Sequence, residues 1–130
     1  MPALARITLW LGGLGFLAFG FAFLIAPLQT FAAAGLTLEG PLAATELRAF
    51  YGGLELALGV LLIAADLRPH QRRNGVILCL ASFGGIGSAR LLGIALAGSA
   101  TPFLWAALAV ELGLAAMAAL ALRGQKTEFR

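Results

Sequence analysis

Cysteine, histidine and charged side chains are scarce in this sequence. Its 130 residues include one cysteine and one histidine, and 12% of them are charged. A single cysteine excludes a disulfide-stapled secreted domain, and a single histidine leaves no pair of axial ligands for a haem within one chain. Because 61% of the residues are hydrophobic, a disordered chain is excluded as well. We expect no metal site and no bound cofactor.

The hydrophobic fraction exceeds what a soluble domain of this size carries. Soluble domains are roughly half apolar and a quarter charged, and a short chain has too little polar surface to cover more apolar mass. The sequence therefore predicts an integral membrane protein. A net charge of +3 would favour a nucleic-acid partner in a soluble protein. In a membrane protein, topology distributes the basic residues, so we expect no nucleic-acid partner.

Four apolar stretches reach the roughly 20 residues that a membrane-spanning helix needs. The expected spans are about 7–26, 45–65, 74–97 and 102–122. We predict a single all-α domain over residues 1–130, an antiparallel four-helix bundle in the membrane. Thr45 is predicted to cap the second helix, and Thr101, followed by Pro102, the fourth. The first stretch is longer than a signal-peptide core of roughly 7–15 residues, so we interpret it as a retained helix.

The basic residues set the predicted orientation. With four spans, both termini and the middle loop lie on one side of the membrane, together with Asp66 and Glu128. That side carries seven of the nine lysines and arginines, namely Arg6, Arg68, Arg72, Arg73, Arg123, Lys126 and Arg130. The positive-inside rule then places both termini in the cytoplasm.

The two loops on the other side differ in length. The connection over residues 27–44 is long and apolar, so we expect it on the membrane surface or folded over the bundle mouth as a lid. A packed connector without function is the alternative. The link over residues 98–100 is very short, which makes the third and fourth helices antiparallel neighbours.

Small residues recur every four positions along the third predicted helix. Such a stripe lets a neighbouring backbone approach closely and carries no chemistry by itself. Its members are Ala81, Gly85, Ala89, Gly93 and Ala97.

Three ionisable residues, Glu55, Arg90 and Glu111, fall well inside the predicted spans. A charge at the bilayer centre opposes insertion by roughly 2.5–3.5 kcal/mol, so all three should face the bundle interior and pair there. At a rise of about 1.5 Å per residue they lie at similar depth, and the guanidinium can reach either carboxylate. Two carboxylates around one arginine leave an excess negative charge, which favours a proton on one of them.

A polar stripe on the second helix extends this cluster towards the outer surface, and together they form an expected pocket. In the functional interpretation, the arginines bind an anion or carbonyl, the glutamates carry protons or anchor polar groups, and the tyrosine donates a hydrogen bond. In the alternative, the charges form an ion-pair network that only fixes helix register. The pocket residues are Glu46, Arg48, Tyr51, Glu55, Arg90 and Glu111.

The run from Thr45 to Glu55, TELRAFYGGLE, contains the pattern Glu-x-Arg-x-x-Tyr-Gly-Gly over residues 46–53. This run resembles an uncharacterised family of bacterial inner-membrane proteins, DUF4345, which is related in architecture to DoxX-like four-helix proteins. The likeness covers nearly the whole chain, including Pro27 and Arg90. It implies a compact four-helix domain in the bacterial inner membrane and supplies no substrate or catalytic residues. DoxX-like proteins are associated with quinone-linked redox chemistry, but this sequence has no cofactor ligands that would transfer it.

Three functions remain open at this stage. The leading hypothesis is a non-enzymatic membrane protein that binds or transports a small amphipathic or anionic ligand, such as a lipid or another small molecule. The second is an accessory or structural subunit of a larger membrane complex or homo-oligomer, in which small-residue stripes face the partner. The third is a quinone- or lipid-linked membrane enzyme that uses Glu55 or Glu111 as an acid–base group.

Overall fold

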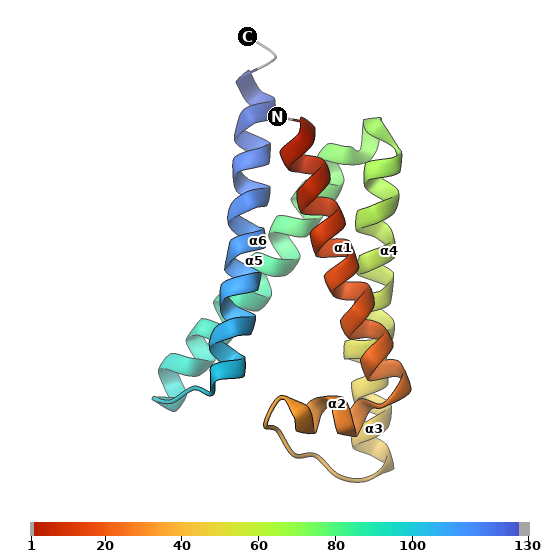
Figure 1. Ribbon diagram of the computed structural model, residues 1–130, viewed down its shortest axis with the longest axis vertical. Coiled ribbons are helices and arrows are strands. Elements are labelled where there is room, and N and C mark those ends of the chain that lie inside the picture. Colours follow the sequence, from red (N-terminus) through yellow and green to blue (C-terminus); the bar gives the residue numbers. More distant parts are fainter. Residues whose placement is uncertain (1, 128–130) are drawn as a thin grey trace.

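The computed structural model describes residues 2–127, and side chains up to residue 124, all in helices and short connections (Figure 1). Glu128 and Arg130, which the sequence assigns to the basic side, lie outside the described residues, as does the side chain of Lys126. Four helical segments are long and apolar enough to cross a membrane, which confirms the predicted all-α class. The chain thus has the make-up of a multi-pass membrane protein.

The second span is composite, and two short helices lie in the connections. The helices are α1 (Pro2–Ile25), α2 (Pro27–Ala33), α3 (Pro41–Leu47), the π-helix η1 (Arg48–Gly53), α4 (Leu54–Leu67), the 3-10 helix η2 (Pro69–Gln71), α5 (Arg72–Ala97) and α6 (Pro102–Thr127).

Local sequence explains where the second and fourth spans begin. The second begins at Pro41, earlier than predicted, because Gly40 at φ +92° turns the chain and proline is favoured in a first helical turn. The predicted cap at Thr45 is wrong, since its hydroxyl lies inside the helix and donates to the Pro41 carbonyl at 2.8 Å. The cap at Thr101 is confirmed, because its Oγ1 accepts a hydrogen bond from the Leu104 N–H at 3.3 Å.

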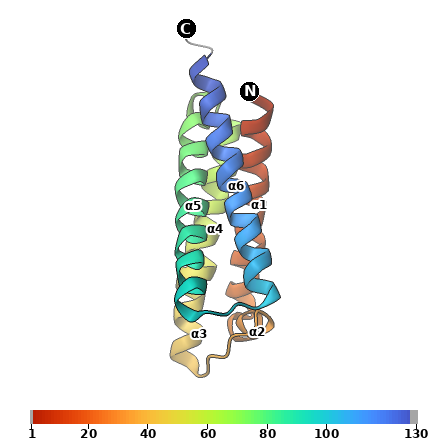
Figure 2. The same ribbon diagram turned by 90° about the vertical axis from the view of Figure 1, so that its left-hand side faces the viewer.

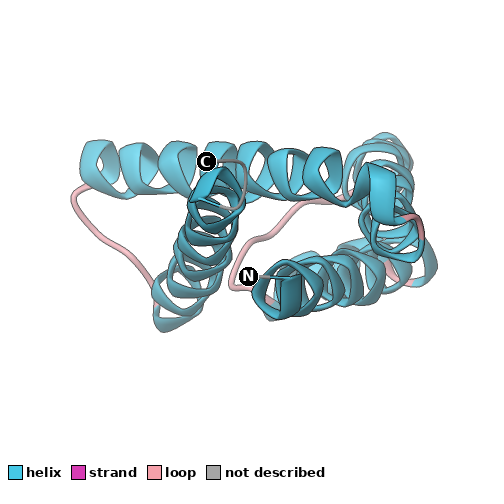
Figure 3. Ribbon diagram, turned by 90° about the horizontal axis from the view of Figure 1, so that it is seen from above, coloured by secondary structure: helices cyan, strands magenta, loops and turns pink. Residues whose placement is uncertain are grey.

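The spans form two antiparallel hairpins. In the first, α1 packs along η1 and α4, and in the second, α5 packs along α6. We call the end where α1 begins and α6 finishes the terminal end, and the end that holds α2 the loop end. The hairpins lie close together at the terminal end and diverge towards the loop end (Figure 1), while the view in Figure 2 shows both running the length of the molecule. Seen from above, α5 and α6 lead away from α1 and α4 (Figure 3).

Glycines bring the backbones of the first hairpin together. A Cβ atom added at Gly59 would lie 2.8 Å from the Gly13 carbonyl oxygen, and one at Gly20 would lie 3.0 Å from the Gly52 carbonyl oxygen. These distances leave no room for a side chain. As in other membrane helix pairs, small residues therefore permit the close approach of α1 to the second span.

The small-residue stripe on α5 does not serve this purpose within the chain. All five of its residues are exposed, and a Cβ at Gly85 or Gly93 would have no described atom within 4 Å outside its own helix. Within the described chain, glycines bring α1 against the second span, and no neighbouring helix packs on the α5 stripe. The buried face of α5 instead carries Val76, Cys79 and Phe83, which belong to the apolar core.

The segment after α1 folds back over the loop end. The Thr30 hydroxyl donates to the Ala22 carbonyl of α1 at 3.1 Å. The Phe31 ring packs edge-on against Phe23, with ring centroids 6.4 Å apart. In Figure 1, α2 accordingly lies across the region where the two hairpins diverge.

Candidate functional site

Arg90 and Glu111 form a forked ion pair between α5 and α6. Arg90 Nε lies 2.8 Å from Glu111 Oε2, and Arg90 Nη2 lies 2.6 Å from Glu111 Oε1. The helices approach closely here, because a Cβ at Gly87 would lie 3.3 Å from the Glu111 Cβ. The Glu111 side chain is 11% exposed and the Arg90 side chain 26%. Two parallel hydrogen bonds give such a pair both strength and a fixed geometry, so it sets the register of the second hairpin.

Glu55 faces this ion pair from the first hairpin. It is the second residue of α4, is half-buried, and lies close enough to Arg90 and Glu111 for electrostatic interaction. It takes no part in the ion pairs or side-chain hydrogen bonds of the described residues. The structure thus brings the three intramembrane charges together, but Arg90 pairs with Glu111 alone. When all three are ionised, the cluster carries a charge of −1 and Glu55 is uncompensated.

The segment before Glu55 is a π-helix, where the sequence predicts a regular α-helix. This segment, η1, has the sequence RAFYGG and therefore contains the arginine, tyrosine and both glycines of the sequence pattern. A π-helix accommodates one extra residue per turn and is frequent at functional sites. The small residue at Gly52 lets η1 lie against the α1 backbone, since a Cβ there would lie 3.3 Å from Leu24 N. The paired glycines were the available signal in the sequence.

The polar residues of η1 face different neighbours. Arg48 Nε donates to the Leu24 carbonyl at 3.0 Å, which satisfies a backbone acceptor in the last turn of α1. The Tyr51 ring packs against Phe23 with centroids 4.9 Å apart, and Tyr51 also lies within electrostatic range of Arg90. Glu46, in α3, is exposed and forms no ion pair with a described residue. Of the other five predicted pocket residues, Glu111 is bound to Arg90 and Tyr51 and Glu55 lie within electrostatic range of it, whereas Glu46 and Arg48 lie nearer the loop end.

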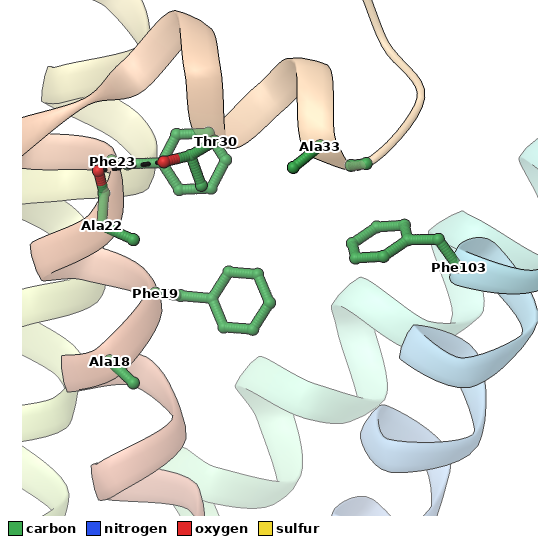
Figure 4. Close-up of a pocket in the computed structure, with 8 residues that line it drawn as sticks. Ala18, Phe19, Ala22, Phe23, Thr30, Ala33 and Phe103 are labelled. Carbon is green, nitrogen blue, oxygen red and sulfur yellow. Dashed lines mark hydrogen bonds between the residues drawn. The ribbon is translucent and has the colours of Figure 1, made fainter.

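An apolar cavity of about 310 Å³ lies between α1, α2 and α6 (Figure 4). Phe19 and Phe103 point into it from opposite hairpins, and the hydroxyl of Thr30 is already bonded to the Ala22 carbonyl. Phe23 also lines the cavity and stacks on Tyr51, so aromatic contacts lead from the cavity to the charged cluster. No pattern in the sequence predicts this cavity. Its lining residues are Ala18, Phe19, Ala22, Phe23, Thr30, Ala33, Ala34 and Phe103.

A second buried carboxylate, Asp66, lies at the terminal end and was also missed. Its side chain is 1% exposed. Asp66 Oδ2 accepts a hydrogen bond from Trp10 Nε1 at 2.9 Å and a longer one from Arg6 Nε at 3.4 Å. Asp66 Oδ1 accepts one from Arg72 Nε at 2.8 Å. Its position between an apolar run and a basic turn suggested a solvated charge, whereas it joins α1, α4 and α5.

The described part of the chain contains no candidate set of metal ligands. No group of three histidine, cysteine, aspartate or glutamate residues there is arranged to hold a metal ion. The buried thiol of Cys79 lies in the core and is unpaired.

Comparison with known proteins identifies the family. The profile of the family described as "Domain of unknown function (DUF4345)" matches residues 4–122, which cover nearly all of the four spans. The chain belongs to this family. None of the curated proteins and none of the solved structures matches it. Membership in DUF4345 therefore supports the four-helix domain, and any function has to be argued from the site itself.

Proposed function

We propose that this protein binds a small amphipathic molecule between its two hairpins, within the membrane. The observation that carries the proposal is the pairing of an apolar cavity of about 310 Å³ with a charged cluster in the region where the hairpins diverge. Ligand sites are typically apolar hollows with a few polar groups that orient the ligand. The Phe23–Tyr51 stack links the two parts of this site. Ionisable residues in a membrane interior mark functional sites more often than structural ones.

The ion pair favours an amphipathic ligand over a simple anion. Glu111 neutralises the charge of Arg90 through two hydrogen bonds, so a simple anion meets no net positive charge at this pair. Arg48, the other predicted anion ligand, donates to the Leu24 carbonyl. A ligand that fills the cavity and presents a polar group to the cluster requires neither contact to break.

We further propose that the protein lies in the bacterial inner membrane with both termini in the cytoplasm. Among the described side chains, the terminal end carries five basic residues, of which Arg6 and Arg72 pair with Asp66. The loop end carries a single basic residue, Arg48. This asymmetry supports the orientation through the positive-inside rule. Fusing a reporter that is active on one side only to the C-terminus tests it, and activity on the opposite side contradicts it.

A partner protein, or a second copy of the chain, is the second candidate. The exposed stripe on α5, from Ala81 to Ala97, offers the small-residue surface on which membrane helices associate. Purification in mild detergent tests this candidate. A monodisperse monomer without a co-purifying protein argues against it, and a stable dimer that Gly85→Leu dissociates supports it.

Native mass spectrometry tests the binding proposal directly. We expect the protein released from detergent to retain an amphiphile of defined mass. Ala22→Trp fills the cavity and removes that mass, while the control Ala57→Trp, at an exposed position of α4 outside the cavity, leaves it. Equal retention by both variants, or no bound mass in the wild type, contradicts the proposal.

A further inference from the structure

The charges around the site determine which head group it accepts. Among the described residues Glu55 has no ion-pair partner, and Arg90, which lies within electrostatic range of it, is bound by Glu111. In this half, α2 and the loop-end part of α1 bring no charged side chain, α5 brings Arg90 and α6 brings Glu111, while Glu46 and Arg48 lie nearer the loop end. With Glu55 ionised, a group that enters this region meets a net negative charge, and a cation removes the cost of leaving that charge uncompensated in a medium of low polarity.

The aromatic residues near the site also favour a positively charged head group. The faces of aromatic rings carry negative charge and attract ammonium groups within about 6 Å. Phe23, Phe31 and Tyr51 form a contiguous cluster, with centroids 4.9 Å apart for Phe23–Tyr51 and 6.3 Å apart for Phe31–Tyr51. Phe23 lines the cavity, and Tyr51 precedes Glu55 by about one helical turn. The aromatic cluster thus connects the cavity lining to the residue one turn before Glu55.

Resting on the proposed function, we propose that the ligand is an amphipathic cation, an alkylammonium or a similar lipophilic amine. Its apolar chain occupies the cavity between Phe19 and Phe103, and its head group lies at Glu55 with the Tyr51 ring alongside. The Arg90–Glu111 pair stays closed and holds the second hairpin in place. Arg48, the other cation of this half, stays on the Leu24 carbonyl. Binding in this way neutralises the charge that the protein leaves uncompensated.

The test uses three probes with one tail and different head groups. Dodecyltrimethylammonium, dodecanol and dodecyl sulfate are titrated into the protein in phosphatidylcholine nanodiscs, and empty nanodiscs are subtracted. We expect the cation to bind at least about tenfold more tightly than the alcohol, and the sulfate to bind most weakly. Glu55→Gln reduces the affinity for the cation to that of the alcohol and leaves the alcohol unchanged. The control Glu39→Gln, which removes one exposed acid near the loop end, keeps the preference.

A second variant keeps the proposal testable if Glu55→Gln fails to fold. Tyr51→Leu removes the aromatic face while the carboxylate remains, and we expect the cation to lose about threefold in affinity with the alcohol unaffected. Equal loss for both probes shows that the ring only shapes the cavity and overturns its role in recognising a cation.

The remaining outcomes separate this inference from the proposed function. If all three probes bind alike and Ala22→Trp abolishes their binding, the site is an amphiphile site without charge preference, and only the inference is overturned. If the sulfate binds most tightly, Arg90 is the recognising residue and the inference is again overturned. If no probe binds above empty nanodiscs, or Ala22→Trp has no effect, the proposed function fails as well.

Discussion

Two groups of buried carboxylates lie in opposite halves of the bundle, and their partners differ. At the terminal end, Asp66 accepts hydrogen bonds from three donors on two other helices. Towards the loop end, Glu111 has one arginine as its partner, and Glu55 has no ion-pair partner among the described residues. Asp66 therefore has two arginines and a tryptophan around one negative charge. The two glutamates have one arginine between them.

This difference agrees with the shape of the molecule. Asp66 belongs to the first hairpin and binds Arg72 of the second, so it joins the two hairpins at the terminal end. Arg90 and Glu111 both belong to the second hairpin, so their pair strengthens that hairpin without joining it to the first. The hairpins are therefore free to diverge towards the loop end, where the cavity lies (Figure 1).

The largest expected effect comes from leaving a charge unpaired inside the membrane. Glu111→Leu removes the partner of Arg90, and we expect the free energy of unfolding to fall by about 3–5 kcal/mol. Replacing both residues, in Arg90→Met with Glu111→Leu, restores most of that loss because no charge remains buried. Equilibrium unfolding in mixed micelles measures both. A single variant as stable as the wild type would show that the pair contributes nothing to the second hairpin.

The next largest loss of stability is expected at the contact between the two hairpins. Asp66→Asn keeps the size of the side chain but removes the charge that binds Arg6 and Arg72, and we expect a loss of about 2–3 kcal/mol. The smaller value reflects the 60% exposure of Arg6, whose charge remains solvated. Hydrogen exchange should increase where α1 meets α5 at the terminal end. If exchange increases only between α5 and α6, Asp66 does not join the hairpins.

The sequence predicts the spans and the meeting of the three intramembrane charges because both follow from the cost of polar groups in hydrocarbon. Length and hydropathy are sufficient for four helices, and Thr101 with Pro102 marks the start of α6. The choice of Glu111 over Glu55 as the partner of Arg90 depends on which helices pack side by side, as Gly87 shows by its contact with Glu111.

Other features leave little trace in a single sequence. Apolar periodicity does not distinguish a π-helical turn from an α-helical one, so η1 was predicted as regular helix. Asp66 follows an apolar run and precedes basic residues, and the same pattern is typical of a solvated helix end. The stripe of α5 has the same spacing as a packing surface, but α1 and α4 pack through Gly13 and Gly59 instead.

The two hairpins should also respond differently to the smallest change in side chain. Gly59→Ala places a methyl group 2.8 Å from the Gly13 carbonyl oxygen, and we expect a loss of about 1–2 kcal/mol through overpacking. Gly85→Ala meets open space on α5, and because alanine is the better helix former it should change stability by less than about 0.5 kcal/mol. Thermal unfolding of the two variants in one detergent measures the difference. Equal losses would mean that α5 is packed against a partner under those conditions.

The smallest expected effect on stability distinguishes the two carboxylates near Arg90. Glu55→Gln keeps the shape of the side chain and removes a charge that no ion pair compensates, so we expect stability to rise by up to about 1 kcal/mol. Glu111→Gln, the matched control, breaks a forked pair and should be clearly destabilising. A gain in stability on removing Glu55 would agree with its proposed role as a ligand contact, because binding residues are often not optimal for stability. If the two variants lose equal stability, Glu55 is a structural member of the cluster and is not a carboxylate free to contact a ligand.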